Sequence, residues 1–397
     1  MKNNKTRSVA ILSGEIPSTT FIEHLILGVS KTYTVKLFGT VSKSTTYEAN
    51  VEIYETPTNR FKNLCLTVYR GLSLLIRRPK DYKLLVKEIQ RFSSRFERWT
   101  WFSKFVPIVL YRPDILHLQW ARDLEFYAFF KTTFNIPLVL SLRGAHINYT
   151  PIVEPKIASL YKKTFPLVDT FHAVSNAIAG EATKYGNIEN RTVHIPSPLP
   201  NAFFTKYKPR PTRTNGLINI VSVGRFHWVK GFRYAIDAIS ILKTRGYEVR
   251  YTIIGASQKS EAILFQLHQL QLQSEVHIKG KLPQDDVLKY LQTQDVLLLP
   301  SIKEGLANVV LEAMAIGLPV ISTDCGGMAE VIIHKETGWL VPVRDAEAIA
   351  NAVVDFVNTD NESLNQLTKK AHHRVSEQHD YDTIIAAFIN LYDTICT

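Results

Sequence analysis

Residues 296–323 read VLLLPSIKEGLANVVLEAMAIGLPVIST, and this stretch contains the pattern that decides the fold. Short apolar runs at 296–299 and 320–323 are typical of strands buried on both faces of a parallel sheet. The segment between them, from about Asn308, is apolar on nearly every side and has the length of a crossover helix. The stretch therefore predicts a strand–helix–strand unit of an α/β domain.

The same alternation extends outward in both directions along the chain. Helical patterns such as 232–246 and 345–357 separate most of the apolar runs, which predicts right-handed crossovers and parallel sheets. We expect two doubly wound Rossmann-like domains facing a cleft, with ligands at the carboxyl ends of the strands. The strand-like runs are at 8–14, 34–39, 115–119, 137–143, 170–175 and 191–197, and then at 218–224, 249–255, 276–280, 296–301, 319–324 and 337–343.

Residues 196–216 divide the two series. The segment PSPLPNAFFTKYKPRPTRTNG holds five prolines and lacks periodicity, as a linker between domains does. We predict an N-terminal Rossmann-like domain at 1–200, a linker at 201–216 and a C-terminal Rossmann-like domain at 217–378. The last segment, 379–397, is predicted as a helix that can return to the first domain.

Composition is typical of a folded cytoplasmic protein. Of 397 residues, 45% are hydrophobic and 21% are charged, which is the balance of a soluble globular chain. The cysteines, Cys65, Cys325 and Cys396, form no close pair, so a disulfide scaffold or a zinc site is not expected. The N-terminus lacks the features of a signal peptide, and no apolar run is long enough to span a bilayer.

The net charge of +11 is concentrated in the segment 60–112, which holds thirteen Lys or Arg and three acids, a balance of 13 − 3 = +10. Apolar residues recur at helical spacing between Tyr82 and Trp99, beside a stripe of cations. The stripe is either the solvated face of a core helix or a docking surface for anionic lipid or a diphosphate-linked acceptor. Nucleic acid is the weakest alternative, because no binding motif accompanies the charge. The stripe is formed by Lys83, Lys87, Arg91 and Arg95, with Phe92, Phe96 and Trp99 beside it.

Two cations follow the first strand-like run of the second series. Residues 223–232, VGRFHWVKGF, place Arg225 and Lys230 on a loop between a strand and a helix. A guanidinium fork and a compact ammonium are suited to a diphosphate. The alternative is that both are solvated loop cations.

A helix N-terminus follows the strand-like run at 296–301. Unsatisfied amides at this end attract anions, which predicts a phosphate site at 305–309. Glu304 lies beside it, and Glu312 lies one turn into an apolar helix, where a carboxylate can accept hydrogen bonds from a ribose diol. Diphosphate, ribose and sugar together indicate a nucleotide sugar. The residues expected at this end are Gly305, Leu306, Ala307, Asn308 and Val309.

With these motifs the chain resembles the retaining glycosyltransferases of family 4, which have the GT-B fold. The resemblance is carried by VGRFHWVKG, by the two glutamates separated by seven residues, by LEAMAIGLPVISTDCGGMAEVI and by TGWLVPV. In the first half, SGEIPSTTFI and RPDILHLQ are similar to members that build bacterial exopolysaccharide or colanic-acid-like polymers.

The resemblance assigns roles residue by residue. It implies donor-diphosphate contacts for Arg225 and Lys230, ribose contacts for Glu312 and sugar contacts for Glu304. Gly14 is expected to approach the donor from the first domain. Catalytic roles are expected for Arg225, Lys230, Glu304 and His146, and acceptor contacts for Gln119, Trp120, Arg143 and His146.

Two features of the first domain stand apart from this assignment. Relatives often read His-Gly-x-Asp where this chain reads RGAH, with Arg143 in place of the histidine and His146 in place of the aspartate. His117, within a strand-like run, is interpreted as a hydrogen-bonded structural histidine rather than a base.

The function expected is transfer of a hexose, with retention, from a UDP- or GDP-sugar to a glycan or lipid-linked acceptor. No cofactor and no metal are expected, because the two cations and the helix N-terminus can neutralise the diphosphate. The alternatives are a nucleotide-sugar epimerase of the same fold and a non-catalytic subunit that binds sugar nucleotides. A dinucleotide-dependent oxidoreductase is disfavoured, because ILSGEIPSTTF lacks the Gly-x-Gly-x-x-Gly turn.

Overall fold

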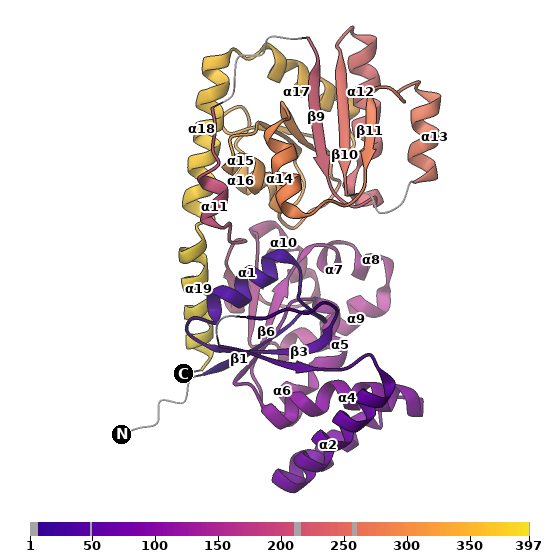
Figure 1. The fold of residues 1–397 in the computed structure, drawn as a ribbon, viewed down its shortest axis with the longest axis vertical. Helices are drawn as coiled ribbons and strands as arrows, with labels where there is room; N and C mark the ends of the chain where they lie inside the picture. Colours follow the sequence, from indigo (N-terminus) through magenta and orange to yellow (C-terminus); the bar gives the residue numbers. More distant parts are fainter. Residues whose placement is uncertain (1–6, 48–49, 210–215, 256–259, 397) are drawn as a thin grey trace. The chain divides into compact units, whose positions relative to one another are not determined.

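The structure is a computed structural model that describes residues 7–47, 50–209, 216–255 and 260–396. Two compact α/β units make up the chain, each with its own sheet (Figure 1). The first comprises Met1–Val174, Ile178–Pro198 and Asp382–Thr397, and the second comprises Ser175–Ala177 and Leu199–Tyr381. Residues 210–215 of the predicted linker lie outside the described residues, and its first residues form α11 (Asn201–Phe204).

The first unit contains a parallel sheet of eight strands. Their order is β2-β3-β1-β5-β6-β7-β8, and β4 pairs with β3 on a branch from this path. Two of the strands were not expected from the sequence: β2 has only two residues, and β4 is half exposed, so neither has a continuous apolar run. The strands are β1 (Ser8–Leu12), β2 (Glu15–Ile16), β3 (Thr34–Val41), β4 (Val51–Glu55), β5 (Ile115–Leu118), β6 (Leu138–Leu142), β7 (Thr170–Ala173) and β8 (Thr192–His194).

Helices of the first unit cover its sheet and extend beyond it (Figure 1). The longer helices are α1 (Thr20–Val29), α2 (Arg60–Arg77), α3 (Pro79–Ile89), α4 (Arg95–Tyr111), α9 (Pro155–Thr164) and α19 (Tyr381–Ile395). The shorter ones are α5 (Leu124–Tyr127), α6 (Phe129–Phe134), α7 (Gly144–Asn148), α8 (Thr150–Val153) and α10 (Asn176–Ala182). Single 3₁₀ turns occur at Ala121–Asp123, Phe165–Leu167, Thr183–Tyr185 and Glu189–Arg191.

The prediction of a single basic helix around Tyr82–Trp99 is wrong, because this segment forms parts of two helices. α3 ends at Ile89, and α4 begins after Ser94, whose hydroxyl and Glu97 form a capping box. The predicted stripe of Lys83, Lys87, Arg91 and Arg95 therefore does not lie along one helix. Arg91 is in the connecting turn and pairs with Glu88 of α3 at 2.9 Å.

A chain of buried hydrogen bonds ties α19 into the first unit. The Tyr392 hydroxyl lies 2.7 Å from Nδ1 of His117, and Nε2 of His117 lies 2.9 Å from the Ser141 hydroxyl. That hydroxyl also contacts Nδ1 of His172 at 2.8 Å. Burial lowers the pKa of His117, and burial with the nearby Arg143 lowers the pKa of His172 to about 3, so both rings are neutral. The interpretation of His117 as a structural histidine is confirmed.

The second unit contains a parallel sheet of six strands in the order β11-β10-β9-β12-β13-β14. All six predicted strands of this half are present, as are the six of the first half. The strands are β9 (Ile218–Val223), β10 (Val249–Ile254), β11 (Val276–Lys279), β12 (Val296–Leu299), β13 (Val320–Thr323) and β14 (Trp339–Val341).

Helices pack on both faces of this sheet, and one apolar cluster lies on each face. One cluster unites the strands with α12 (Phe232–Thr244), α13 (Glu261–Gln269) and α17 (Ala346–Asn358). The other unites them with α14 (Gln284–Gln292), α15 (Asn308–Ala315), α16 (Met328–Val331) and α18 (Asn361–Gln378). Both units thus have the doubly wound architecture expected from the sequence. No helix in the described part of the chain combines the length and the apolarity that crossing a bilayer requires.

Candidate functional site

The strand order of the second unit fixes where a ligand can bind. Crossovers run in opposite directions from β9 and β12, which are neighbours in the sheet, so the topological switch point lies between them. The loop after β9 carries Arg225 and Lys230, and the loop after β12 carries Ser301 and Glu304. The amide of Ile302 donates to the Val229 carbonyl at 2.7 Å, which joins the two loops at this edge.

An ion pair connects two of the predicted site residues across these loops. Nζ of Lys230 lies 2.7 Å from Oε1 of Glu304, and the buried Ser301 hydroxyl donates to the same oxygen at 2.7 Å. The two side chains are only 21% and 13% exposed, so the pair is partly shielded from water. Arg225, by contrast, is exposed beside them. The site therefore has one cation already paired and one directed to solvent.

Close backbone packing between the loops depends on two glycines with positive φ. A Cβ at Gly231 (φ +64°) would lie 2.0 Å from the Pro300 carbonyl oxygen. A Cβ at Gly326 (φ +60°) would lie 2.0 Å from the carbonyl oxygen of Glu304. Any other residue would force the loops apart, because both contacts are to backbone atoms. The two glycines thus hold Glu304 beside Lys230.

The helix that follows this loop begins where the sequence predicts. α15 starts at Asn308, and its N-cap, Ala307, has no side chain that can satisfy the first amides. Gly305, Leu306 and Val309 belong to the same turn of chain, next to the Lys230–Glu304 pair. A helix N-terminus beside two cations is an arrangement that suits a diphosphate.

Glu312 lies one turn further into α15, in largely apolar surroundings. Burial raises the pKa of its carboxyl to about 7, although a hydrogen bond from Nε2 of Gln284 at 3.0 Å opposes the shift. A carboxyl so placed can hold a proton or accept hydrogen bonds from a diol, according to what faces it. Its position next to the helix N-terminus is as predicted.

Three further residues shape this site that sequence reasoning did not single out. Ser301 and Gln284 hold the two glutamates, as described above. His227 caps the 3₁₀ turn Trp228–Lys230 by accepting a hydrogen bond from the Val229 amide, and burial together with Arg225 and Lys230 lowers its pKa. Nothing in the sequence marks Gln284, because its partner lies 28 residues away.

In the first unit the switch point lies between β1 and β5, and it collects three of the predicted residues. Gly14, with φ +93°, follows β1, while Gln119 and Trp120 follow β5. The backbone N–H of Gln119 donates to the Leu12 carbonyl at 3.0 Å. The Trp120 ring nitrogen donates to the Ser13 carbonyl at 3.2 Å. These bonds hold the two strand ends together.

Arg143 and His146 join this group from the end of β6. Nη2 of Arg143 donates to Oε1 of Gln119 at 3.3 Å, and its guanidinium lies 4.5 Å from the centre of the Phe21 ring. Burial lowers the pKa of Arg143 to about 9. The His146 ring lies 5.6 Å from that of Trp120. The structure therefore brings together the four residues expected to contact an acceptor.

Two donor atoms in this group lack an acceptor among the described residues. Nε2 of Gln119 and Nε of Arg143 are buried and make no hydrogen bond to any described residue. Buried donors in proteins are nearly always satisfied, which makes these two atoms exceptions.

The described ranges contain no cluster of side chains that could hold a metal ion. His, Cys, Asp and Glu side chains nowhere gather there in threes around one point. The sequence holds one Asp-x-Asp stretch, Asp380 to Asp382, at the start of α19. It belongs to neither of the loops that form the candidate phosphate site.

A family comparison matches the second unit. Residues 204–374 match the family described as glycosyl transferases group 1. The matched range includes Arg225, Lys230, both glutamates and α15, which are the residues placed at the switch point above.

Two of the relatives in sequence are named for colanic acid and amylovoran biosynthesis. The chain is 32% identical over 250 residues to the putative colanic acid biosynthesis glycosyltransferase WcaL of Escherichia coli, covering 61% of this chain and 58% of that protein. It is 38% identical over 139 residues to the amylovoran biosynthesis glycosyltransferase AmsK of Erwinia amylovora, covering 34% of each. The aligned part is thus little more than half the length of the first relative and a third of the second.

Solved structures share the whole fold. Anabaena HepE, solved in complex with UDP-glucose, has a TM-score of 0.69 and 16% identity, with 98% of this chain and 99% of that chain covered. The sucrose-phosphate synthase of Thermosynechococcus elongatus has a TM-score of 0.74 and 17% identity, with the same coverage. The two parallel-sheet α/β domains are those of the GT-B glycosyltransferase fold, and residues 204–374 form a glycosyl transferases group 1 domain.

Proposed function

We propose that the protein is a retaining glycosyltransferase of bacterial surface polysaccharide synthesis. It transfers a hexose from a nucleotide diphosphate sugar to a glycan or lipid-linked acceptor at the cytoplasmic face of the membrane. The observation that carries this proposal is the convergence of Lys230, Glu304, Arg225 and the α15 N-terminus at the switch point of the second sheet. The neighbour HepE was solved with UDP-glucose, which supports a nucleotide-sugar donor.

Donor binding divides among these residues according to their chemistry. The exposed Arg225 and the amides at the start of α15 receive the diphosphate. Its negative charge competes with Glu304 for Lys230, whose ammonium then turns from the carboxylate to a phosphate oxygen. Glu304 is released to accept hydrogen bonds from hydroxyls of the sugar. Glu312 accepts hydrogen bonds from the ribose diol, deeper in the same segment.

Bond cleavage at the anomeric carbon leaves charge on the departing diphosphate. Lys230, Arg225 and the helix N-terminus are already aimed at that charge, so stabilisation requires little reorganisation. No metal ion is needed in this scheme. We propose that retention arises from attack on the same face of the sugar, with a donor phosphate oxygen accepting the proton of the acceptor hydroxyl.

Acceptor contacts are assigned to the first unit. Trp120 offers a ring face for a sugar, and His146 lies beside it. The unsatisfied donors Nε2 of Gln119 and Nε of Arg143 mark a polar environment at the carboxyl ends of β5 and β6. These groups support recognition of a sugar rich in oxygen acceptors.

Calorimetry and product analysis test the proposal. UDP, GDP and the corresponding glucose and mannose nucleotides are titrated into the protein, and the one that binds is then incubated with a lipid-linked or oligosaccharide acceptor. The expected products are free nucleoside diphosphate and an extended acceptor whose new linkage has the anomeric configuration of the donor. Inversion of that configuration contradicts the retaining mechanism. Conversion of the donor sugar without transfer identifies an epimerase, and binding without turnover identifies a non-catalytic subunit.

A further inference from the structure

Helix α2 has its apolar and polar faces reversed relative to an ordinary surface helix. The residues it buries are Thr67, Arg70, Gly71 and Leu74, only one of which has a large apolar side chain. The Arg70 guanidinium turns inward and donates to the Glu55 carbonyl at 2.8 Å. A surface helix normally buries its apolar stripe. Here the apolar stripe is left outside.

The outward face of α2 is a continuous apolar stripe. Phe61 is 74% exposed at one end of the helix, and Ile76 is 79% exposed near the other. The spacing of three or four residues puts the side chains on one side, along a helix about 27 Å long at 1.5 Å per residue. We call this set the α2 stripe: Phe61, Leu64, Val68, Leu72, Leu75 and Ile76. The exposed Cys65 lies within it.

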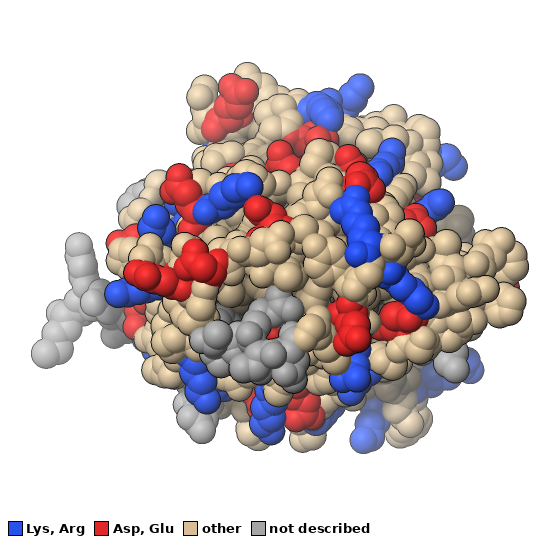
Figure 2. Space-filling model, turned by 90° about the horizontal axis from the view of Figure 1, so that it is seen from above, with Lys and Arg blue, Asp and Glu red and all other residues tan. Residues whose placement is uncertain are grey.

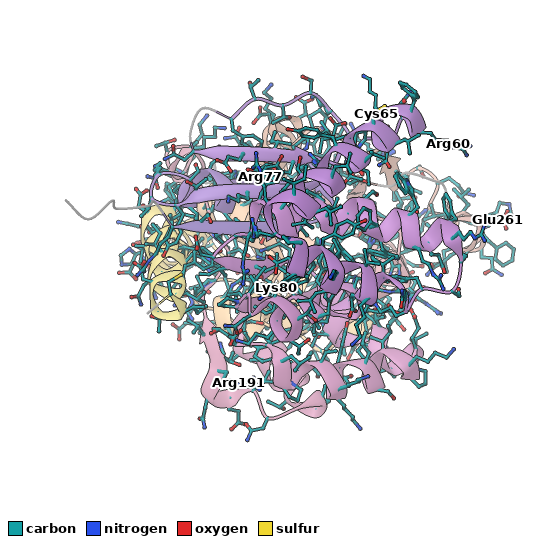
Figure 3. The ribbon with its side chains drawn as sticks, turned by 90° about the horizontal axis from the view of Figure 1, so that it is seen from below. Arg60, Cys65, Arg77, Lys80, Arg191 and Glu261 are labelled. Carbon is teal, nitrogen blue, oxygen red and sulfur yellow. The ribbon has the colours of Figure 1, made fainter. Side chains whose placement is uncertain are left out.

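Exposed basic side chains lie at both ends of α2, and the helix contains no acid. No Asp or Glu occurs between Thr56 and Lys80, and the whole segment 60–112 carries 13 − 3 = +10. Its three acids contact neighbours within the segment: Asp81 with Arg78, Glu88 with Arg91, and Glu97 with the Ser93 hydroxyl. Exposed cations lie along α2 and at the start of α3, as Figure 3 shows for Arg60, Arg77 and Lys80.

Elsewhere the charges are mixed. Figure 2 shows one face of the molecule, on which Lys and Arg alternate with Asp and Glu. Such a face has no strong preference for anionic surfaces. The α2 stripe differs because it combines a large apolar area with charge of one sign.

We propose that the α2 stripe is the surface by which the protein docks on an anionic phospholipid bilayer. An amphipathic helix with an apolar face and flanking cations lies in the plane of the membrane interface, with its apolar side chains in the headgroup–acyl boundary. A second copy of the chain is a poorer occupant, because α2 contains cations and no acid, so two copies meeting at its stripe would bring like charges together. The proposal extends the proposed function, since it brings a transferase to a lipid-linked acceptor.

Co-sedimentation with vesicles tests the proposal without donor or acceptor, so its failure would leave the proposed transfer intact. The probes are vesicles of phosphatidylcholine and vesicles in which part of that lipid is replaced by phosphatidylglycerol. The protein is expected to sediment with the second kind and to be released as the Debye length shortens from about 30 Å at ~0.01 M salt to about 8 Å at ~0.15 M. Equal sedimentation with both kinds of vesicle contradicts the proposal that anionic lipid attracts the stripe.

A pair of matched variants separates the stripe from general surface apolarity. Leu72→Ser with Ile76→Ser removes two exposed side chains of the α2 stripe. Leu264→Ser with Phe265→Ser removes two exposed apolar side chains of α13 in the second unit. We expect the first variant to partition about tenfold or more less strongly into anionic vesicles, and the second to behave as wild type. Equal behaviour of the two variants overturns the proposal.

Cys65 supplies a direct probe of insertion. In a Cys396→Ser background the exposed Cys65 is labelled with an environment-sensitive fluorophore, while Cys325 remains buried. Anionic vesicles are expected to shift its emission to the blue, and bromine-bearing acyl chains are expected to quench it. The control carries the label at Phe265→Cys in a chain with Cys65→Ser and Cys396→Ser. A blue shift that follows protein concentration without vesicles shows that a second copy covers the stripe and overturns the proposal, as does the absence of any change with vesicles.

Discussion

The ammonium of Lys230 and the carboxylate of Glu304 lie 2.7 Å apart across the two loops that meet at the switch point of the second sheet. Each residue is assigned to a different part of the donor, the diphosphate and the sugar. Before the donor binds, each neutralises the other, so neither charge is isolated in a partly buried site. Binding exchanges this internal pair for two contacts with the donor.

Glu304→Gln tests that exchange. We expect the variant to bind UDP or GDP, whichever the wild type binds, as tightly as wild type or more tightly, because Lys230 no longer has a competing carboxylate. Binding of the corresponding sugar nucleotide is expected to gain less, and turnover to fall, because the contact with the sugar hydroxyls is weakened. Lys230→Ala is the counterpart and is expected to weaken the binding of both ligands, the nucleoside diphosphate and the sugar nucleotide. If Glu304→Gln weakens the sugar-free nucleotide as much as Lys230→Ala does, the two residues do not divide the donor as described.

Arg225→Ala is expected to lower turnover about 10²-fold, the order seen when a donor to a developing anion is removed. The matched control is Arg250→Ala, since Arg250 is also exposed but lies near the amino end of β10, opposite the carboxyl ends where the loops meet. Steady-state release of nucleoside diphosphate measures both. Equal losses in the two variants would assign the effect to surface charge in general.

Glu312→Gln should weaken nucleotide binding by roughly 1–3 kcal/mol, the scale of a hydrogen bond to a charged group. Calorimetry with the nucleoside diphosphate measures the loss. The circular dichroism spectrum of the variant serves as the control for folding. Unchanged affinity in a folded variant contradicts the assignment of Glu312 to the ribose.

The same substitution has the opposite effect on the stability of the ligand-free protein at high pH. Burial raises the pKa of Glu312 from 4.5 to about 7, so between these values the folded protein holds a proton that the unfolded chain has released. The free energy of unfolding therefore falls as pH rises through this window, by up to about 3 kcal/mol at 1.36 kcal/mol per unit. Glu312→Gln cannot ionise and avoids the loss.

Denaturant unfolding at pH 5 and pH 8 checks this effect. We expect the stability of the variant relative to wild type to increase with pH and to favour the variant most at pH 8. A difference that is the same at both values means that the carboxyl of Glu312 does not titrate between them.

Chelation provides a further prediction. Transfer is expected to continue in EDTA, because Lys230, Arg225 and the α15 N-terminus supply the positive charge that a metal would otherwise supply. The measurement is turnover before and after dialysis against the chelator. A complete loss that Mg²⁺ or Mn²⁺ restores contradicts this scheme.

Most of the fold can be predicted from the sequence, because parallel strands that are buried on both faces consist of continuous apolar runs. All twelve such runs are strands, and α15 begins at Asn308 as expected. The edge strand β4 was missed because an exposed strand needs no such run. The break between α3 and α4 was missed because helical spacing of apolar residues continues across the capping box at Ser94.

The candidate site divides in the same way. Arg225, Lys230, Glu304 and Glu312 could be proposed because each adjoins a strand end or a helix start that the pattern itself predicts. The hydrogen bond between Gln284 and Glu312 could not, since it depends on how α14 packs beside α15. The orientation of α2 could not be predicted either. The spacing of apolar residues shows which side chains share one side of a helix, but not whether that side faces the core or the solvent.

The tie between α19 and the first unit sets an order for biosynthesis. Phe388 and Tyr392 are buried in that unit, and Asp393 accepts a hydrogen bond from the Tyr33 hydroxyl at 2.5 Å. A ribosome makes these residues nearly two hundred positions after Pro198, which closes the earlier part of the unit. The domain synthesised first must therefore wait with an open core until α19 has been made, while the second unit already has its whole chain.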